Sequence, residues 1–201
     1  IFEETGGELR PLLSETGKTL VLQWIAQEQE KNLKVLGQNL KRRGAVAKMK
    51  SLVSELMQYQ VTAEDLEQWQ ERAKGKPLLA LKLQDIGCIY QAFEEYLRDS
   101  YVTPEGVLEV MEQKLEQSEK IRSSEILFDG FVGFTPVQLK VLRKLMALCP
   151  KLLVTVTMDE RENPIGRCGP QNQFFASKKM VRQLMDRAQD ARCQVLPEIW
   201  T

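Results

Sequence analysis

From Ser124 onward the sequence alternates strand, helix and strand patterns, and this order constrains the fold more than any other feature of the chain. The apolar run in "SEILFDG" and the β-branched run in "KLLVTVTMDE" have the length and composition of buried strands. Between them, "TPVQLKVLRKLMALCP" begins with a capping Thr135 and a first-turn Pro136, followed by an apolar helical stripe. Strands connected in this way lie parallel, with a right-handed crossover. We therefore predict an α/β region with strands near 125–129 and 152–158.

The sequence before Ser124 predicts helices. "AVAKMKSLVSELMQY" places apolar residues at steps of three and four, and "TAEDLEQWQERA" opens with the capping-box pair Thr62 and Asp65. "LLALKLQDIGCIYQAFEEYLRDS" predicts one helix of about twenty residues. After the second strand we expect a helix from about 174 to 192 and an edge strand in "CQVLPEI". The fold class is thus α/β but predominantly helical, with a helical subdomain over 1–118 and a partial α/β domain over 119–201.

Composition limits the chemistry. The chain has no histidine, which excludes Ser-His-Asp and Cys-His systems and imidazole bases within it. Its four cysteines are far apart in the sequence, so a self-contained zinc or iron-sulfur site is not expected. We interpret them as reduced thiols of a cytosolic protein. No apolar run is long enough to span a membrane, and no signal peptide opens the chain. It begins at Ile1 in mid-pattern, so we expect a piece of a longer protein.

Gly17-Lys18-Thr19 matches the last three letters of a nucleotide-binding P-loop. However, Leu12 stands where the motif needs its first glycine, and no strand pattern precedes it. We interpret the segment as a helix capped by Ser14 or Thr16 that runs to about Glu30. Its inner face is predicted to carry three apolar residues, Leu20, Trp24 and Ile25. A small phosphotransferase using Lys18 and Asp129 is a minor alternative, because no phosphate loop accompanies the acid.

Basic residues are concentrated in one part of a chain whose 28 basic and 28 acidic residues otherwise balance. Between Lys31 and Ser54 there are seven basic residues and no acidic one. Such asymmetry is typical of a local polyanion contact, for which Lys41, Arg42, Arg43 and Lys48 are the candidate residues. A solvated helix face would have the same pattern.

The acids that follow the two predicted strands are candidates for a ligand site, because ligands of open parallel sheets bind at the carboxyl ends of the strands. These acids are Asp129 and Asp159. A hydrophobic run followed by Asp is how phosphoryl-transfer NTPases hold Mg²⁺, although Asp before Gly is also a common turn. Phe131 and Phe134 follow in a Gly-punctuated loop. We expect them either to pack beneath the loop or to stack on bases of a single-stranded nucleic acid.

Three segments carry a resemblance to a known family. "SEILFDGFVGFTPVQLKVLRKLM", "ETGGELRPLLSETG" and "KLQDIGCIYQAFEEYL" look like the AddB family, the B subunits of AddAB-type helicase-nucleases. The resemblance extends in order over essentially the whole chain. It implies a UvrD-like, P-loop-NTPase-like motor fold, in which 14–118 is the inserted helical subdomain. It also implies a bacterial, cytoplasmic heterodimer with an A subunit, acting in DNA double-strand break processing and recombinational repair.

The resemblance assigns Asp129 to the Walker-B position, where Mg-ATP would bind in the full subunit. Active helicases of this superfamily follow that Asp with a Glu that orients water, whereas Gly130 stands here. The true P-loop and the iron-sulfur nuclease domain of the family are expected outside this chain. We therefore expect no catalytic residues, no metal and no cofactor in the chain itself, and no activity from it alone.

Two functions follow from the sequence. The first is a non-catalytic, DNA-handling part of an ATP-dependent helicase/exonuclease subunit, with single-stranded DNA or a duplex end as its partner. The second is a helical protein–protein interaction module that docks on the partner subunit, for which the neutral charge and the amphipathic helices are grounds. Neither reading involves a membrane.

Overall fold

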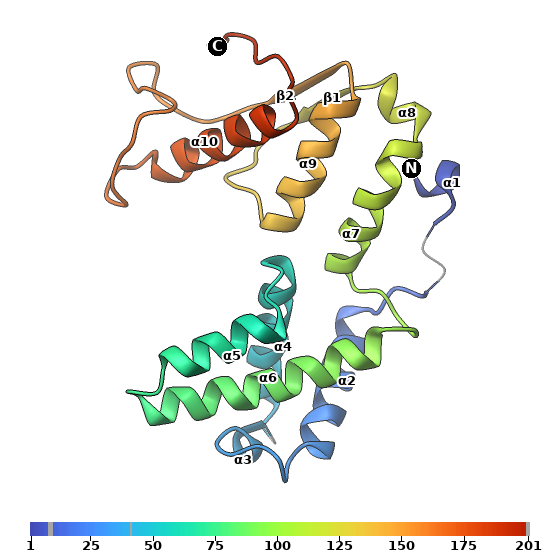
Figure 1. Ribbon diagram of the computed structural model, residues 1–201, viewed down its shortest axis with the longest axis vertical. Coiled ribbons are helices and arrows are strands. Elements are labelled where there is room, and N and C mark those ends of the chain that lie inside the picture. Colours follow the sequence, from blue (N-terminus) through green and yellow to red (C-terminus); the bar gives the residue numbers. More distant parts are fainter. Residues whose placement is uncertain (8–9, 41, 200–201) are drawn as a thin grey trace. The chain divides into compact units, whose positions relative to one another are not determined.

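The computed structural model describes residues 1–7, 10–40 and 42–199, and all their side chains except that of Arg43. The chain forms two compact units (Figure 1). We call residues 8–107 the helical unit, and residues 1–7 with 108–201 the α/β unit. Among the described residues, no helix combines the length and the apolar character needed to cross a membrane.

The helical unit contains five complete helices among its described residues, and it ends in the first turn of a sixth. They are α2 (Glu15–Glu28), α3 (Gly37–Leu40), α4 (Arg43–Gln58), α5 (Ala63–Arg72), α6 (Pro77–Leu97) and the start of α7 (Pro104–Lys114). Helices α5 and α6 pack side by side (Figure 1). The core is made by apolar residues of α2, α4, α5 and α6, among them Leu22, Ile25, Val53, Leu66, Ile89 and Phe93.

Local signals in the sequence account for the ends of these helices. The Thr62 hydroxyl accepts a bond from the Asp65 N–H while the Asp65 carboxylate accepts one from the Thr62 N–H, so the predicted capping box is confirmed. Helix α6 begins at Pro77 and is 21 residues long, as the sequence predicts. The apolar stripe of α4 is also confirmed, because Val46, Met49, Val53 and Leu56 are buried.

The inner face predicted for α2 is partly wrong. Ser14 is the cap, since its hydroxyl accepts a bond from the Gly17 N–H at 3.1 Å, and Ile25 is buried. Leu20 and Trp24, however, are 62% and 51% exposed. The buried face instead carries Lys18, Val21, Leu22, Ile25 and Ala26, which follow helical spacing from a lysine that the prediction had not counted as an inner residue.

The α/β unit holds the predicted strand–helix–strand order. Its elements are α1 (Phe2–Thr5), the rest of α7, a 3₁₀ turn (Leu115–Gln117), α8 (Glu119–Arg122), β1 (Glu125–Phe128), α9 (Pro136–Leu148), β2 (Lys151–Val154) and α10 (Phe175–Asp190). Strands β1 and β2 pair in parallel, with Glu125 opposite Lys151 and Phe128 opposite Val154. Thr135 caps α9 as predicted, and Gln138 completes a capping box that was not part of the prediction.

One face of the sheet is covered and the other is open. Helices α9 and α10 lie on one side of the strands (Figure 1). Alternate residues, among them Phe128, Leu152 and Val154, pack against apolar residues of these helices. The residues between them point the other way, and the paired Leu127 and Leu153 are 60% and 48% exposed. An apolar pair in water is unusual for parallel strands, which are normally covered on both faces.

Two strand predictions require correction. Strand β2 ends at Val154 rather than near 158, because Gly130, with φ of 75°, turns the chain away after β1 and leaves residues 156–158 without a neighbouring strand. The expected edge strand in "CQVLPEI" is wrong. Residues 194–199 are exposed and irregular, and Pro197 has no N–H to donate to a ladder. The mostly helical chain with a small parallel sheet is α/β.

Two leucines of α2 test this packing. Leu22 is 1% exposed and Leu20 is 62% exposed. Leu22→Ala should lower the free energy of unfolding by about 2–5 kcal/mol, because it leaves a cavity in the core. The matched control Leu20→Ala should change it by no more than about 0.5 kcal/mol. Denaturant unfolding of both variants measures this, and equal losses would contradict the orientation of α2.

Candidate nucleic-acid interface

The carboxyl edge of the sheet places Asp129 beside Thr155. Asp129 directly follows β1 and Thr155 directly follows β2, so the parallel register brings them together. The Thr155 hydroxyl donates to Asp129 Oδ1 at 2.5 Å and accepts a bond from the Gly130 N–H at 3.3 Å. The Asp129 side chain is exposed. A carboxylate is thus held in one orientation at the rim of the sheet, where the sequence predicted it.

The loop after Asp129 carries an aromatic cluster. Phe131 and Phe134 are stacked with ring centroids 5.0 Å apart, and both rings meet Phe128 edge-on. Phe134 belongs to the core beneath the loop, whereas Phe131 is 40% exposed. The two residues therefore differ in exposure. Phe134 packs, and Phe131 offers a supported ring to solvent.

The segment after β2 is tied to α10. Lys178, which is 4% exposed, donates to Glu162 at 2.5 Å, and Arg182 donates to the Gly166 carbonyl at 2.9 Å. Asp159 does not join Asp129 at the strand ends. It binds Arg161 through two side-chain bonds, because β2 ends five residues before it. That ion pair holds the pKa of the Asp159 carboxyl below its ordinary value.

Two of the four predicted basic contacts can be described. Arg42, just before α4, and Lys48, within it, are exposed, and neither pairs with a carboxylate of the described chain. Lys41 lies outside the described residues, as does the side chain of Arg43. Lys50 differs from its neighbours, since it donates to Glu15 at 2.7 Å. Arg42 and Lys48 thus project into water, the first from just before α4 and the second from its first half.

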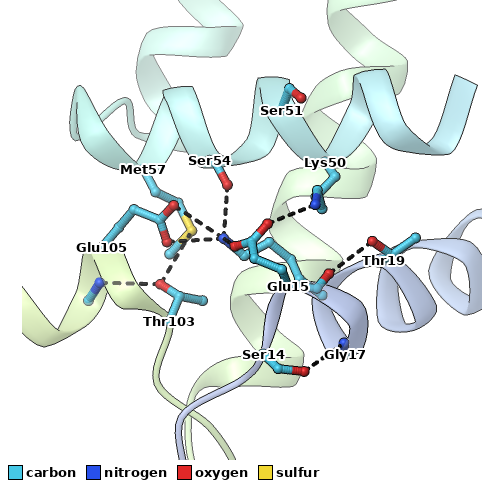
Figure 2. Close-up of polar contacts among 12 residues, drawn as sticks. Ser14, Glu15, Gly17, Thr19, Lys50, Ser51, Ser54, Met57, Thr103 and Glu105 are labelled. Carbon is cyan, nitrogen blue, oxygen red and sulfur yellow. Dashed lines mark hydrogen bonds and ion pairs between the residues drawn. The ribbon is translucent and has the colours of Figure 1, made fainter. Parts of the chain in front are cut away.

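Lys18 of the P-loop-like triplet is a buried structural residue. Its side chain is fully enclosed within the helical unit. The ammonium donates to Ser54 of α4 at 2.8 Å and to the two carboxylate oxygens of Glu105 in α7 at 3.2 and 3.1 Å (Figure 2). Glu15 lies 3.4 Å from it. The three hydrogens of the ammonium group are thus all donated within the protein. Lys18 cannot bind a phosphate in this arrangement, which argues against the phosphotransferase alternative.

The partners of Lys18 compensate a charge that would otherwise be strongly unfavourable inside the unit. Burial by itself would raise the pKa of the Glu105 carboxyl. A bond from its own backbone N–H and the attraction of Lys18 outweigh that effect and lower the pKa below its ordinary 4.5. The pKa of Glu15 is also lowered, first by the bond from Lys50 and further by Lys18. Lys18, Glu15 and Glu105 therefore form a cluster of ionised side chains, which with Ser54 joins α2, α4 and the start of α7.

The predicted site residues form two groups. Asp129, Phe131 and Phe134 lie together on the α/β unit, whereas the basic residues lie on the helical unit. Sequence reasoning missed Thr155, the residue that orients Asp129. Thr155 falls inside the strand predicted near 152–158. Its place beside Asp129 follows from the register, in which Val154 lies opposite Phe128.

The family model described as "ADDB, N-terminal" matches residues 1–201. The chain belongs to the AddB N-terminal family. Three relatives, each named as the B subunit of an ATP-dependent helicase/deoxyribonuclease, illustrate the similarity. The protein of Lachnoclostridium phytofermentans is 42% identical over 99% of the chain, that of Thermoanaerobacter sp. strain X514 is 33% identical over 92%, and that of Listeria innocua is 30% identical over 98%. The chain spans only 17%, 16% and 17% of their respective lengths.

The resemblance also implied Mg-ATP at Asp129, and the chemistry of the residue fits that role. Mg²⁺ is commonly held by one or two carboxylates together with substrate phosphates and water. Asp129 supplies one exposed, oriented carboxylate. The described residues contain no group of three or more His, Cys, Asp or Glu arranged for a metal.

The lowered pKa of Glu105 predicts a pH dependence. A carboxyl whose pKa is depressed on folding stabilises the fold above its ordinary 4.5, and this contribution disappears as the pH falls through the lower folded-state pKa. Glu105→Gln should therefore be less stable than wild type at neutral pH, and the difference should shrink below pH 4.5. Thermal unfolding across this range measures it. The exposed Glu67→Gln serves as control, and a difference independent of pH would contradict the role of the ion pair.

Proposed function

We propose that this chain is a DNA-contacting, non-catalytic part of the B subunit of a helicase/deoxyribonuclease. The observation that carries the proposal is the match of the whole chain to the AddB N-terminal family, whose relatives bear that name. Their name includes an ATP-dependent helicase and a deoxyribonuclease, so DNA is the substrate that we propose for the complete protein. The same proposal includes a role of the complete protein in DNA repair and a P-loop-like motor fold. It also includes nucleotide binding and a heterodimer with an A subunit.

Electrostatics supports the helical unit as the phosphate-contacting part. Arg42 and Lys48 are exposed without a carboxylate partner in the described chain, and Lys41 and Arg43 adjoin them in the sequence. Cations of this kind contact the phosphate backbone, which gives affinity and salt dependence with little preference for sequence. Phe131 adds a supported aromatic ring of the kind on which bases of single-stranded DNA stack.

Two features support a non-catalytic role. Gly130 follows Asp129 where active helicases carry a glutamate, and a glycine cannot polarise a water molecule. Lys18, the lysine of the P-loop-like triplet, is enclosed and ion-paired. Asp129 held by Thr155 remains suited to bind Mg²⁺ with a nucleotide in the full-length protein. We therefore expect this part of the protein to handle DNA rather than to hydrolyse ATP by itself.

Changing the four predicted basic residues to alanine tests the phosphate contact. Lys41, Arg42, Arg43 and Lys48 replaced together in the full-length protein should lower the slope of log affinity against log salt by up to about 3, at ~0.7 for each lost contact to a single strand. Fluorescence anisotropy with an unstructured oligonucleotide measures the slope. The control pair Lys74→Ala and Lys151→Ala removes lysines that are ion-paired to Glu71 and Glu125. An unchanged slope in the fourfold variant would remove this segment from the interface.

The aromatic loop gives a separate test. Phe131→Ala should weaken binding to single-stranded DNA by about 5- to 150-fold, which corresponds to ~1–3 kcal/mol, with little change in thermal stability. Phe131→Leu keeps an apolar side chain but should bind single-stranded DNA nearly as weakly as Phe131→Ala, because leucine has no π-face. Phe134→Ala should lower the melting temperature, since Phe134 packs in the core. If Phe131→Ala binds DNA like wild type, stacking is not its function.

Docking on a partner subunit is the second candidate, and exposed aromatic residues favour it. Trp24 lies against Tyr96 with ring centroids 5.9 Å apart, and Tyr96 stacks on Tyr101 at 5.8 Å. Trp24 is half exposed, and Leu20 is exposed one turn before it on α2. Tryptophan and tyrosine are the residues that most often anchor protein interfaces. Under this alternative, Trp24→Ser would prevent assembly with the partner subunit, and the four basic substitutions would leave DNA binding unchanged.

A further inference from the structure

A buried aspartate of α6 holds the loop between α2 and α3. Asp85 is 1% exposed, and its carboxylate accepts three backbone bonds from this loop. Oδ1 accepts from the Lys34 N–H at 2.7 Å, and Oδ2 accepts from Val35 and Leu36 at 2.7 and 2.8 Å. Hydrogen bonds to an ionised acceptor at these distances are short and strong. The loop is therefore fixed to a core helix about fifty residues further along the chain.

Other contacts make the same loop compact. Leu33 is 9% exposed and belongs to the core of the helical unit. A side chain at Gly37 would meet the Glu30 carbonyl at 3.3 Å, so the loop closes tightly on itself. The Asn32 amide donates to Gln29 at 2.7 Å. The backbone of residues 29–37 is thus held from the core side and from within.

This fixed loop carries two exposed lysines. Lys31 and Lys34 stand on either side of the buried Leu33, and neither forms an ion pair within the described chain. They open the segment from Lys31 to Ser54 in which no acidic residue occurs. The Asp85 carboxylate already occupies the N–H groups of 34–36, so an anion from outside would meet the lysine ammonium groups rather than these amides.

We propose that Lys31 and Lys34 contact DNA phosphates and that Asp85 is the positioning residue that holds them in place. The proposal rests on the proposed function and adds a second, preorganised group of contacts to the four basic residues that the sequence singled out. A backbone that is already fixed loses less conformational entropy when phosphates bind, and this raises affinity without a new contact. Asp85 touches no DNA in this arrangement and acts through the loop alone.

Two sets of variants in the full-length protein test it. Lys31→Ala with Lys34→Ala changes only exposed side chains and should weaken binding to an unstructured single strand by roughly tenfold, with a salt slope lower by about 1.4. Asp85→Asn keeps the size of the side chain and removes its charge. It should speed hydrogen exchange of the amides of 34–36 and weaken DNA binding by about three- to tenfold with the slope retained, because both lysines remain.

The outcomes separate this proposal from the one on which it rests. Suppose that the wild type binds DNA, that the fourfold basic variant binds it more weakly, and that Lys31→Ala with Lys34→Ala binds it like wild type. The loop is then not part of the interface, and the proposed function stands. If Asp85→Asn speeds exchange at 34–36 without changing affinity, the positioning role is wrong. If Asp85→Asn fails to fold, the double lysine variant and its charge reversal, Lys31→Glu with Lys34→Glu, still decide the contact. Absence of DNA binding by the wild type would overturn both proposals.

Discussion

A charge that leaves water must find partners inside the protein, and three such charges organise both units of this chain. Lys18 draws Glu105 and Ser54 together and so joins α2, α4 and the first turn of α7. Asp85 attaches the loop before α3 to α6 through three backbone N–H groups. Lys178 binds Glu162 and fixes the segment after β2 to α10. Removing Glu105 would leave the enclosed Lys18 ammonium without its carboxylate, which is strongly unfavourable.

The same compensation separates structural from functional charges. Lys18 and Lys50 are committed to carboxylates of the helical unit, whereas Lys31, Lys34, Arg42 and Lys48 are exposed without such partners in the described chain. At the edge of the sheet, Asp129 is oriented by Thr155 and stays exposed, followed by a glycine rather than a second acid. The exposed cations of the helical unit and the oriented carboxylate of the α/β unit are the charges on which the proposed contacts with DNA and a metal-bound nucleotide rest.

Features set by local sequence were predictable. The parallel arrangement of β1 and β2 followed from the strand–helix–strand order, and the capping box at Thr62 and the cap at Thr135 followed from local sequence. Features set by distant contacts were not. Lys18 is buried only because Glu105, 87 residues away, is present to receive it, and without that knowledge Leu20 and Trp24 looked like the inner face of α2. The different roles of Phe131 and Phe134 likewise depend on which ring the core beneath them accepts.

Lysine-reactivity footprinting of the full-length protein, with and without a single-stranded oligonucleotide, tests the central claim most directly. Lys31, Lys34 and Lys48 should lose reactivity when DNA binds and regain it at high salt, because phosphates cover their ammonium groups. Lys74, exposed just after the end of α5 and paired with Glu71, should not change. If the three lysines react equally with and without DNA while DNA is bound elsewhere on the protein, the helical unit is not its phosphate-contacting surface.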